Sequence, residues 1–301
     1  MSKWQKSPSR RQFLSGSAAA VAGSMSAGAA AAQTPDPLIT QVQDWASYAG
    51  DGVDEVRYGL PIRFEDDVVR RNVPWLTADP ISSINFTPIH ALDGTITPQG
   101  CAFERHHSGA IELRKQDYRL MVNGLVDRPI ILTYADLERL PRVNHVYFCE
   151  CAANTGMEWA GAQLNGAQFT HGMIHNMEYT GVPLRLVLQQ AGLAAAEDLS
   201  NKWVFVEGAD ASSNGRSIPM EKALDDVIVA FKANGEALRK EHGYPVRLVV
   251  PGWEGNLWVK WLRRIEVTDR SVESREETSK YTDVLANGMA RKWTWVMDAK
   301  S

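Results

Sequence analysis

The chain has 301 residues, of which 44% are hydrophobic and 23% are charged, and its formal net charge is -4. This composition is typical of a soluble globular protein and disfavours disordered and membrane classes, while the net negative charge disfavours nucleic-acid binding. The length allows one large domain or two ordinary ones.

The first 32 residues have the features of a bacterial export signal. Basic residues precede an Ala-rich apolar run over residues 13–32, and Arg10 and Arg11 form the pair of a twin-arginine signal. Three glycines within the run weaken the alternative, an Ala-rich helix of the mature protein. We therefore expect cleavage before Gln33 and export of the mature protein to the periplasm.

Residues 33–86 show little periodicity and several prolines, which predicts an N-terminal arm followed by an irregular segment. Strand-like runs rich in β-branched and aromatic residues then occur at residues 118–122, 130–133, 143–148, 203–207, 247–250 and 258–267.

Helical patterns are fewer than strand patterns. Residues 134–140 indicate a short helix, and residues 183–191 a longer one, with apolar side chains at i, i+3, i+4 and i+7 and Gly192 as its stop. Asn234-Gly235, between two apolar runs at residues 227–238, predicts a β-hairpin with a type I′ turn. Strands without regular βαβ alternation predict an α+β fold with mixed sheets, and no internal repeat or second membrane-spanning segment is visible.

Two of the three cysteines follow a buried-looking strand. The run Val146-Tyr147-Phe148 leads to Cys149 and Cys151, and small residues come next, so a strand delivers thiols into a loop. A thiolate is a soft ligand suited to a transition metal, but free cysteines are also among the most buried residues. The stretch by itself leaves both interpretations open. The Cys-x-x-Cys-His motif is absent, so any covalently bound haem must sit on another polypeptide.

From about residue 87 to its end, the chain resembles the molybdenum-cofactor domain of the sulfite oxidase family, and most closely the molybdenum subunits of Sox-pathway sulfane dehydrogenases. The resemblance rests on seven separated motifs in the expected order, at residues 103–107, 151–154, 179–185, 207–210, 217–219, 242–252 and 259–262. It implies a sulfite-oxidase-type molybdopterin-binding fold over residues 87–290 and a bound molybdenum-molybdopterin cofactor.

The resemblance also implies roles for individual residues. Cys151 is expected to be the thiolate on molybdenum, with Tyr281 and Arg105 as its catalytic partners, while Cys149 and Cys101 are expected to be structural. The expected cofactor-binding residues are Phe103, Glu104, Arg105, His106, His107, Asp210, His242, Arg247, Trp258, Val259 and Lys260.

Each of these assignments has an ordinary alternative. Basic residues are usually solvated surface charges, His242 before Gly243 is compatible with a turn, and Tyr281 with a half-buried surface position. Lys260 is the exception, because it falls inside the predicted strand 258–267, where an unpaired ammonium would be costly.

Two departures from the family pattern bear on function. Sulfite oxidases carry, five residues after the metal cysteine, an arginine that grips sulfite, and here this position is Gly156. A roomier and less charged pocket would bind free sulfite poorly but would admit a sulfur atom presented on a carrier protein. The family's immunoglobulin-like dimerisation domain would begin at residues 291–301, where this chain stops, so we expect a truncated sequence.

The resemblance thus implies a periplasmic oxidoreductase that oxidises sulfane sulfur on a carrier protein and passes electrons to a dihaem c-type cytochrome subunit. A homodimer or heterotetramer is expected for a full-length chain. The alternatives are a direct sulfite dehydrogenase, a molybdenum-dependent sulfoxide reductase, and an exported scaffold protein with structural cysteines.

Overall fold

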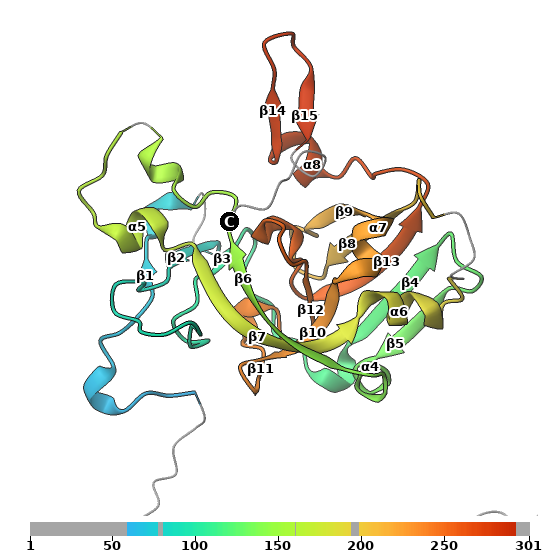
Figure 1. Ribbon diagram of the computed structural model, residues 1–301, viewed down its shortest axis with the longest axis horizontal. Helices are drawn as coiled ribbons and strands as arrows, with labels where there is room; N and C mark the ends of the chain where they lie inside the picture. The colour runs from blue at the N-terminus through green and yellow to red at the C-terminus, as the bar shows by residue number, and fades with distance from the viewer. Residues whose placement is uncertain (1–58, 78–80, 160, 194–198, 293–301) are drawn as a thin grey trace, which may run out of the picture. The chain divides into compact units, whose positions relative to one another are not determined.

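The computed structural model describes residues 59–77, 81–159, 161–193 and 199–292, and its elements are labelled in Figure 1. The predicted signal peptide, the arm up to residue 58 and the last nine residues lie outside the described residues. Among the described helices, none is long and apolar enough to cross a membrane.

The first described segment is mostly irregular and forms one small sheet. Two 3-10 helices, η1 (Arg63–Glu65) and η2 (Pro74–Leu76), flank a short strand, β1 (Arg71–Asn72). This strand pairs antiparallel with β2 (Ser83–Phe86), and β2 pairs with β3 (Arg105–His106). The sheet brings residues 105 and 106 to a fixed position although they lie in a region with little other regular structure.

The second sheet is antiparallel and carries the cysteines. Its strand order is β11 (Glu236–Ala237), β10 (Ile228–Ala233), β7 (Ile174–Pro183) and β6 (Val143–Glu150), and β12 (Arg247–Val249) also pairs with β10. The predicted hairpin is confirmed, because Asn234 and Gly235 both have positive φ, 51° and 75°, as a type I′ turn requires.

The third sheet is mixed. Its order is β5 (Ile130–Thr133), β4 (Arg119–Gly124), β13 (Leu262–Thr268), β8 (Trp203–Gly208) and β9 (Gly215–Pro219). The pair β4 and β13 is parallel and the other pairs are antiparallel. The predicted α+β class with mixed sheets is therefore confirmed.

Short helices connect the strands. The predicted helix at residues 134–140 is α4 (Tyr134–Arg139), whose N-terminus is closed by a capping box between Thr133 and Asp136. The predicted helix at residues 183–191 is α6 (Leu184–Gln190). The remaining helices are α5 (Ala167–His171), α7 (Met220–Asp225) and α8 (Arg275–Ser279), with 3-10 turns η3 (Lys115–Asp117), η4 (Gly156–Glu158), η5 (Lys240–His242) and η6 (Gly255–Leu257). A two-stranded ribbon, β14 (Thr282–Val284) and β15 (Ala290–Lys292), follows α8.

The predicted strand at residues 258–267 is wrong in its first four residues. The strand begins at Leu262, and Trp261 before it has a positive φ of 50°, which no regular strand contains. Lys260 therefore lies in a loop and not within a strand. β7, β9 and α7 were not predicted, because they consist of mixed polar and apolar residues.

Hydrogen bonds join the second and third sheets into one core. The Leu262 amide, at the start of β13, donates to the Val246 carbonyl before β12, at 2.9 Å. The Leu248 amide, in β12, donates to the Val259 carbonyl, in the loop before β13, at 2.7 Å. Apolar side chains from both sheets are fully buried around this junction, including Leu120, Val206, Leu248, Leu262 and Ile265. The loops that leave this core toward β3 form the candidate site.

Candidate active site

One cavity lies where the ends of the three sheets meet. It is open to solvent and is lined mainly by aromatic, basic and other polar side chains. Its wall consists of Phe103, Arg105, His106, His107, Cys149, Cys151, His175, Asp210, Ser212, Asn214, His242, Arg247, Gly255, Asn256, Trp258, Lys260, Trp261 and Tyr281. Residues from positions 103 to 281 thus share one site.

The loop that carries Cys151 begins at the end of β6 and is fastened by Asn154. Cys151 donates its amide to the Met173 carbonyl at 2.9 Å, and the Asn154 side-chain carbonyl accepts the Met173 amide at 3.0 Å. The Asn154 side-chain amide donates to the Glu150 carboxylate at 3.0 Å. Asn154 is buried, so these bonds fix the backbone on both sides of the thiol.

All three cysteines are free thiols, and two of them line the cavity. Cys149 lies on β6 and Cys151 directly after its end, and both side chains face the cavity. Burial raises the pKa of Cys149 to about 12, with a smaller opposing effect from the Arg247 charge. Cys101 is half-buried outside the cavity wall, where its thiol lies 3.6 Å from the Val68 carbonyl.

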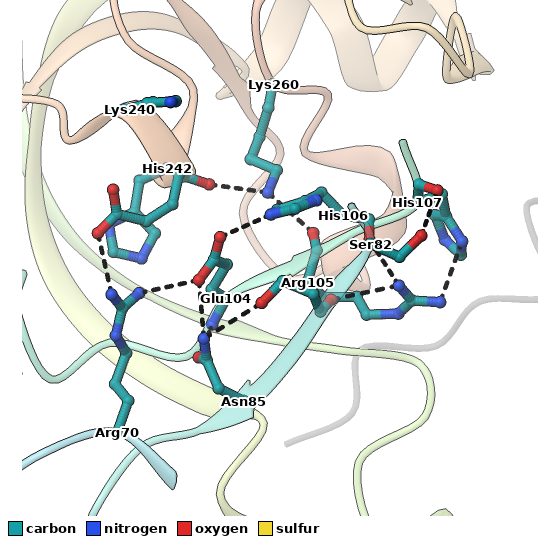
Figure 2. A network of polar contacts seen from close by, with 12 residues as sticks. Arg70, Ser82, Asn85, Glu104, Arg105, His106, His107, Lys240, His242 and Lys260 are labelled. Atoms are coloured by element: carbon teal, nitrogen blue, oxygen red, sulfur yellow. Dashed lines mark hydrogen bonds and ion pairs between the residues drawn. The ribbon is translucent and has the colours of Figure 1, made fainter. Parts of the chain in front are cut away.

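Lys260 extends into the site from the loop before β13. Its ammonium donates to the carbonyls of Arg105 and Glu241, both at 2.8 Å, and Figure 2 shows the side chain reaching toward the Arg105 backbone. Burial, together with repulsion from Arg247, lowers the pKa of Lys260 to about 7. Gly243 makes this approach possible, since its φ is 101° and a Cβ there would lie 3.0 Å from Lys260 Cβ.

Two guanidinium groups add to this positive charge. Arg247 is buried and donates to the carbonyls of His242 at 3.2 Å and Trp258 at 3.1 Å. Arg105 donates to the His106 carbonyl at 2.7 Å. Within the described residues, none of Arg105, Arg247 and Lys260 forms an ion pair with a carboxylate. Their charges are held by carbonyl dipoles, which favours an anionic ligand in the cavity.

A polar network behind the cavity orients His106 in β3 and His107 after it (Figure 2). Glu104 pairs with the His106 ring at 2.6 Å and accepts from the Asn85 side chain at 2.7 Å. Burial would raise the pKa of Glu104, but the hydrogen bonds from His106 and Asn85 and the charge of Arg70 outweigh it and hold the pKa at about 2. Burial and the Arg105 charge lower the pKa of His107 to about 4. The neutral ring therefore accepts a hydrogen bond from the Arg105 guanidinium at Nδ1, over 3.0 Å.

Four buried polar atoms of the cavity wall have no hydrogen-bond partner among the described residues. They are Nδ1 of His106, His175 and His242 and the side-chain oxygen of Asn256. Buried polar atoms are almost always paired in native proteins, so this group indicates a polar ligand at the same place. Together with the three cations, it fits a ligand that bears both hydrogen-bonding ring atoms and negative charge.

The structure brings together the residues predicted to be catalytic. Cys151, Arg105 and Tyr281 all line the cavity. Burial raises the pKa of Tyr281, and the neighbouring Cys151 adds to this effect, so the phenol keeps its proton over the physiological range. The site therefore combines a thiol, a guanidinium and a phenolic hydroxyl donor.

Two of the predicted cofactor-binding residues do not line the cavity. Glu104 lies behind it and holds His106, and Val259 is fully buried in the core. The other predicted residues all belong to the wall, whereas Cys149 was expected to be only structural. Six residues of the wall were not predicted from the sequence: His175, Ser212, Asn214, Gly255, Asn256 and Trp261. No motif marks His175, Gly255 or Asn256, whereas Trp261 lies within the motif at residues 259–262 and Ser212 and Asn214 lie shortly after the motif at residues 207–210.

Comparison with known proteins identifies a family model that matches this chain. The model of the oxidoreductase molybdopterin-binding domain matches residues 107–276. The chain is 33% identical to mitochondrial sulfite oxidase of Mus musculus over 243 residues, which are 77% of this chain and 43% of that protein. It is 36% identical to NADH nitrate reductase of Volvox carteri over 193 residues, which are 60% of this chain and 22% of that protein. The chain thus spans less than half the length of these curated relatives.

A solved structure shares both sequence and fold with this chain. The crystal structure of the sulfane dehydrogenase SoxCD from Paracoccus pantotrophus matches with a TM-score of 0.76 and 69% sequence identity. The match covers 88% of this chain and 67% of the chain in that structure.

Proposed function

The chain belongs to the oxidoreductase molybdopterin-binding domain family, and we propose that it is the molybdenum subunit of a sulfane dehydrogenase. Its substrate would be sulfane sulfur carried on a protein, and its electron acceptor a c-type cytochrome subunit. The observation that carries the proposal is the cavity that brings the Cys151 thiol together with Arg105, Arg247 and Lys260. The 69% identity to the SoxCD structure supports this choice of substrate over the others found in the family.

The residues of the cavity fit the family's cofactor. Arg105, Arg247 and Lys260 would hold the anionic parts, with the guanidinium groups as two-pronged donors and the ammonium as a point charge. The unpartnered histidine nitrogens and the Asp210 carboxylate would bond the pterin ring. Cys151 would be the one protein thiolate on the metal. When bound, the molybdenum cofactor supplies the two-electron oxidation of sulfur and the transfer of an oxygen atom derived from water.

The chain's own residues would then position the substrate and stabilise the negative charge that develops on it. Arg105 is anchored at the wall by the His106 carbonyl and the His107 ring, so its guanidinium would face the oxygen atoms attached to the reacting sulfur. The protonated Tyr281 hydroxyl would donate a hydrogen bond to the same oxygen atoms. Fixed donors of this kind stabilise negative charge that grows during the reaction.

Gly156 favours a protein-bound substrate over free sulfite. It lies in η4, directly after the loop that carries Cys151, where sulfite oxidases have an arginine. A Cβ at this position would meet only the Trp159 ring, at 3.9 Å, so the backbone leaves open space. Gly156 itself lies outside the cavity wall, but without an arginine at this position sulfite would lack its charged clamp.

Gly156→Arg is therefore expected to shift the substrate preference of the enzyme from a carrier protein toward free sulfite. The new guanidinium should raise kcat/KM for sulfite at least roughly 10-fold and lower kcat/KM for a persulfide-loaded carrier protein by a similar factor. Steady-state reduction of cytochrome c with each substrate measures both values.

Gln163→Arg is the matched control, because it adds the same charge to an exposed position of the same loop and should change neither value. The proposal fails if the unmodified protein, loaded with cofactor, prefers free sulfite to the carrier. In that case the chain is a sulfite dehydrogenase, the alternative that the similarity to mouse sulfite oxidase supports.

We further propose that this subunit works in the periplasm after twin-arginine export. The support is the paired arginine signal in residues 1–32 and the absence of a Cys-x-x-Cys-His haem motif from the sequence, which leaves the haem to a partner. Cytochrome c reduction by the chain with and without its cytochrome subunit tests the partnership, since equal rates would contradict it.

A further inference from the structure

Arg216, on β9, is a buried cation directly behind the cavity. Its side chain has no exposed surface, and it is not part of the cavity wall. The guanidinium carbon lies 4.7 Å from the centroid of the Tyr281 ring. Since Tyr281 lines the cavity, Arg216 contacts a residue of the cavity wall without belonging to it.

The backbone around this pair is fastened from both sides. The Ser217 amide donates to the Glu277 carboxylate at 2.6 Å, which ties β9 to α8. The Tyr281 amide donates to the Glu276 carbonyl at 3.0 Å, and the Thr282 hydroxyl donates to the Glu277 carbonyl at 3.0 Å. The chain on either side of Tyr281 is therefore fixed relative to Arg216.

Burying the Arg216 charge carries a desolvation cost. Arg216 Nε lies 3.9 Å from the Glu277 carboxylate, so the two groups form a buried ion pair. Burial lowers the pKa of Arg216 and raises that of Glu277, so both groups are desolvated at a cost. Apolar residues of similar volume often replace buried ion pairs without loss of stability. A guanidinium over an aromatic face does, however, hold the ring in one orientation.

We propose that Arg216 is a positioning residue that fixes the Tyr281 ring in the cavity wall, so that the phenol hydroxyl points at the reacting sulfur group. The inference rests on the proposed function, because it assigns Tyr281 a part in substrate oxidation. It extends the site to a strand that contributes nothing to the cavity wall. The cation acts through the tyrosine and does not touch the substrate.

A double-mutant cycle with Tyr281 tests this role. Arg216→Met should lower kcat roughly 10-fold per molybdenum-loaded chain, with little change in KM, and Arg216→Lys should recover part of the loss. In a Tyr281→Phe background, both substitutions at position 216 should have no further effect on kcat, because the hydroxyl they position is absent. The matched control is Lys115→Met, which removes a cation 4.7 Å from the Tyr134 ring, away from the cavity, and should leave kcat unchanged.

A second measurement reads the ring position without any turnover. The protein is labelled with 3-fluorotyrosine, and the ¹⁹F signal lost in Tyr281→Phe identifies position 281. Arg216→Met should shift or broaden that signal, Arg216→Lys should keep it close to its original position, and Lys115→Met should leave it unchanged.

The inference is overturned if Arg216→Met leaves the Tyr281 signal unchanged, or if its loss in kcat multiplies with that of Tyr281→Phe. If Arg216→Met does not fold, Arg216→Lys with and without Tyr281→Phe decides by the same criteria. Failure of the proposed function would show separately, as an unmodified enzyme that does not oxidise the carrier, and the fluorine measurement would still test Arg216.

Discussion

Cys151→Ser is expected to lower turnover at least about 1,000-fold, which corresponds to about 4 kcal/mol in the activation free energy. A serine hydroxyl is not deprotonated near neutral pH and is a harder ligand than a thiolate, so it would not replace the sulfur on molybdenum. The fold should persist, because the loop is held by the Cys151 backbone amide and the Asn154 side chain. Cytochrome c reduction by cofactor-loaded protein measures the loss.

The other two cysteines provide matched controls for this substitution. Cys101→Ser makes the same chemical change outside the cavity wall and should leave turnover unchanged. Cys149→Ser tests whether the right thiol is assigned, since both thiols line the cavity. If Cys149→Ser loses all turnover while Cys151→Ser stays active, the metal ligand is Cys149 and not Cys151.

Lys260→Met is expected to reduce the amount of cofactor retained after purification at least roughly 10-fold. Methionine has a similar length but removes the charge and both hydrogen bonds, so the anionic part of the cofactor loses one of its three cations. Molybdenum and pterin content per chain measure the effect. Lys240→Met is the control, because this lysine is exposed and pairs with Glu112 at the surface.

The same substitution should change how the stability of the cofactor-free protein depends on pH. The pKa of Lys260 is lowered to about 7 in the fold, well below its ordinary value of 10.5. Between these two values the unfolded chain binds more protons than the folded chain, so stability rises with pH in this window. Below about pH 7 the penalty for the buried charge is complete. Lys260→Met should therefore raise Tm most below pH 7, and the difference should shrink toward pH 10. An equal difference at both pH values would contradict the buried cation.

Much of the fold could be predicted because local patterns agree with the final packing. β5 and the Asn234-Gly235 turn follow from strand propensity and turn chemistry, which depend on neighbouring residues alone. β7 was missed because polar residues such as His175 and Asn176 interrupt its apolar positions. The loop at residues 258–261 was mistaken for a strand because its composition is apolar, whereas its conformation depends on the approach of Lys260 to Arg105 and Glu241.

Site residues that lie within a sequence motif could be predicted, whereas those that reach the cavity from elements without a motif could not. Cys151, Arg105 and Lys260 were identified from separated motifs, and the cavity unites them. His175 and Asn256 contribute unpartnered polar atoms to the same wall but belong to no motif that the sequence analysis used. Glu104 shows the opposite case, because it stands within a motif yet acts behind the cavity, on His106. Adjacency in sequence does not reveal which side of a strand faces the ligand.

The most direct test of the central claim is X-ray absorption at the molybdenum edge on cofactor-loaded protein. If the Cys151 sulfur is bonded to molybdenum, the spectrum of Cys151→Ser should show one sulfur ligand fewer than the unmodified protein, while Cys149→Ser and Cys101→Ser keep the full number. An unchanged sulfur count in Cys151→Ser would contradict the account.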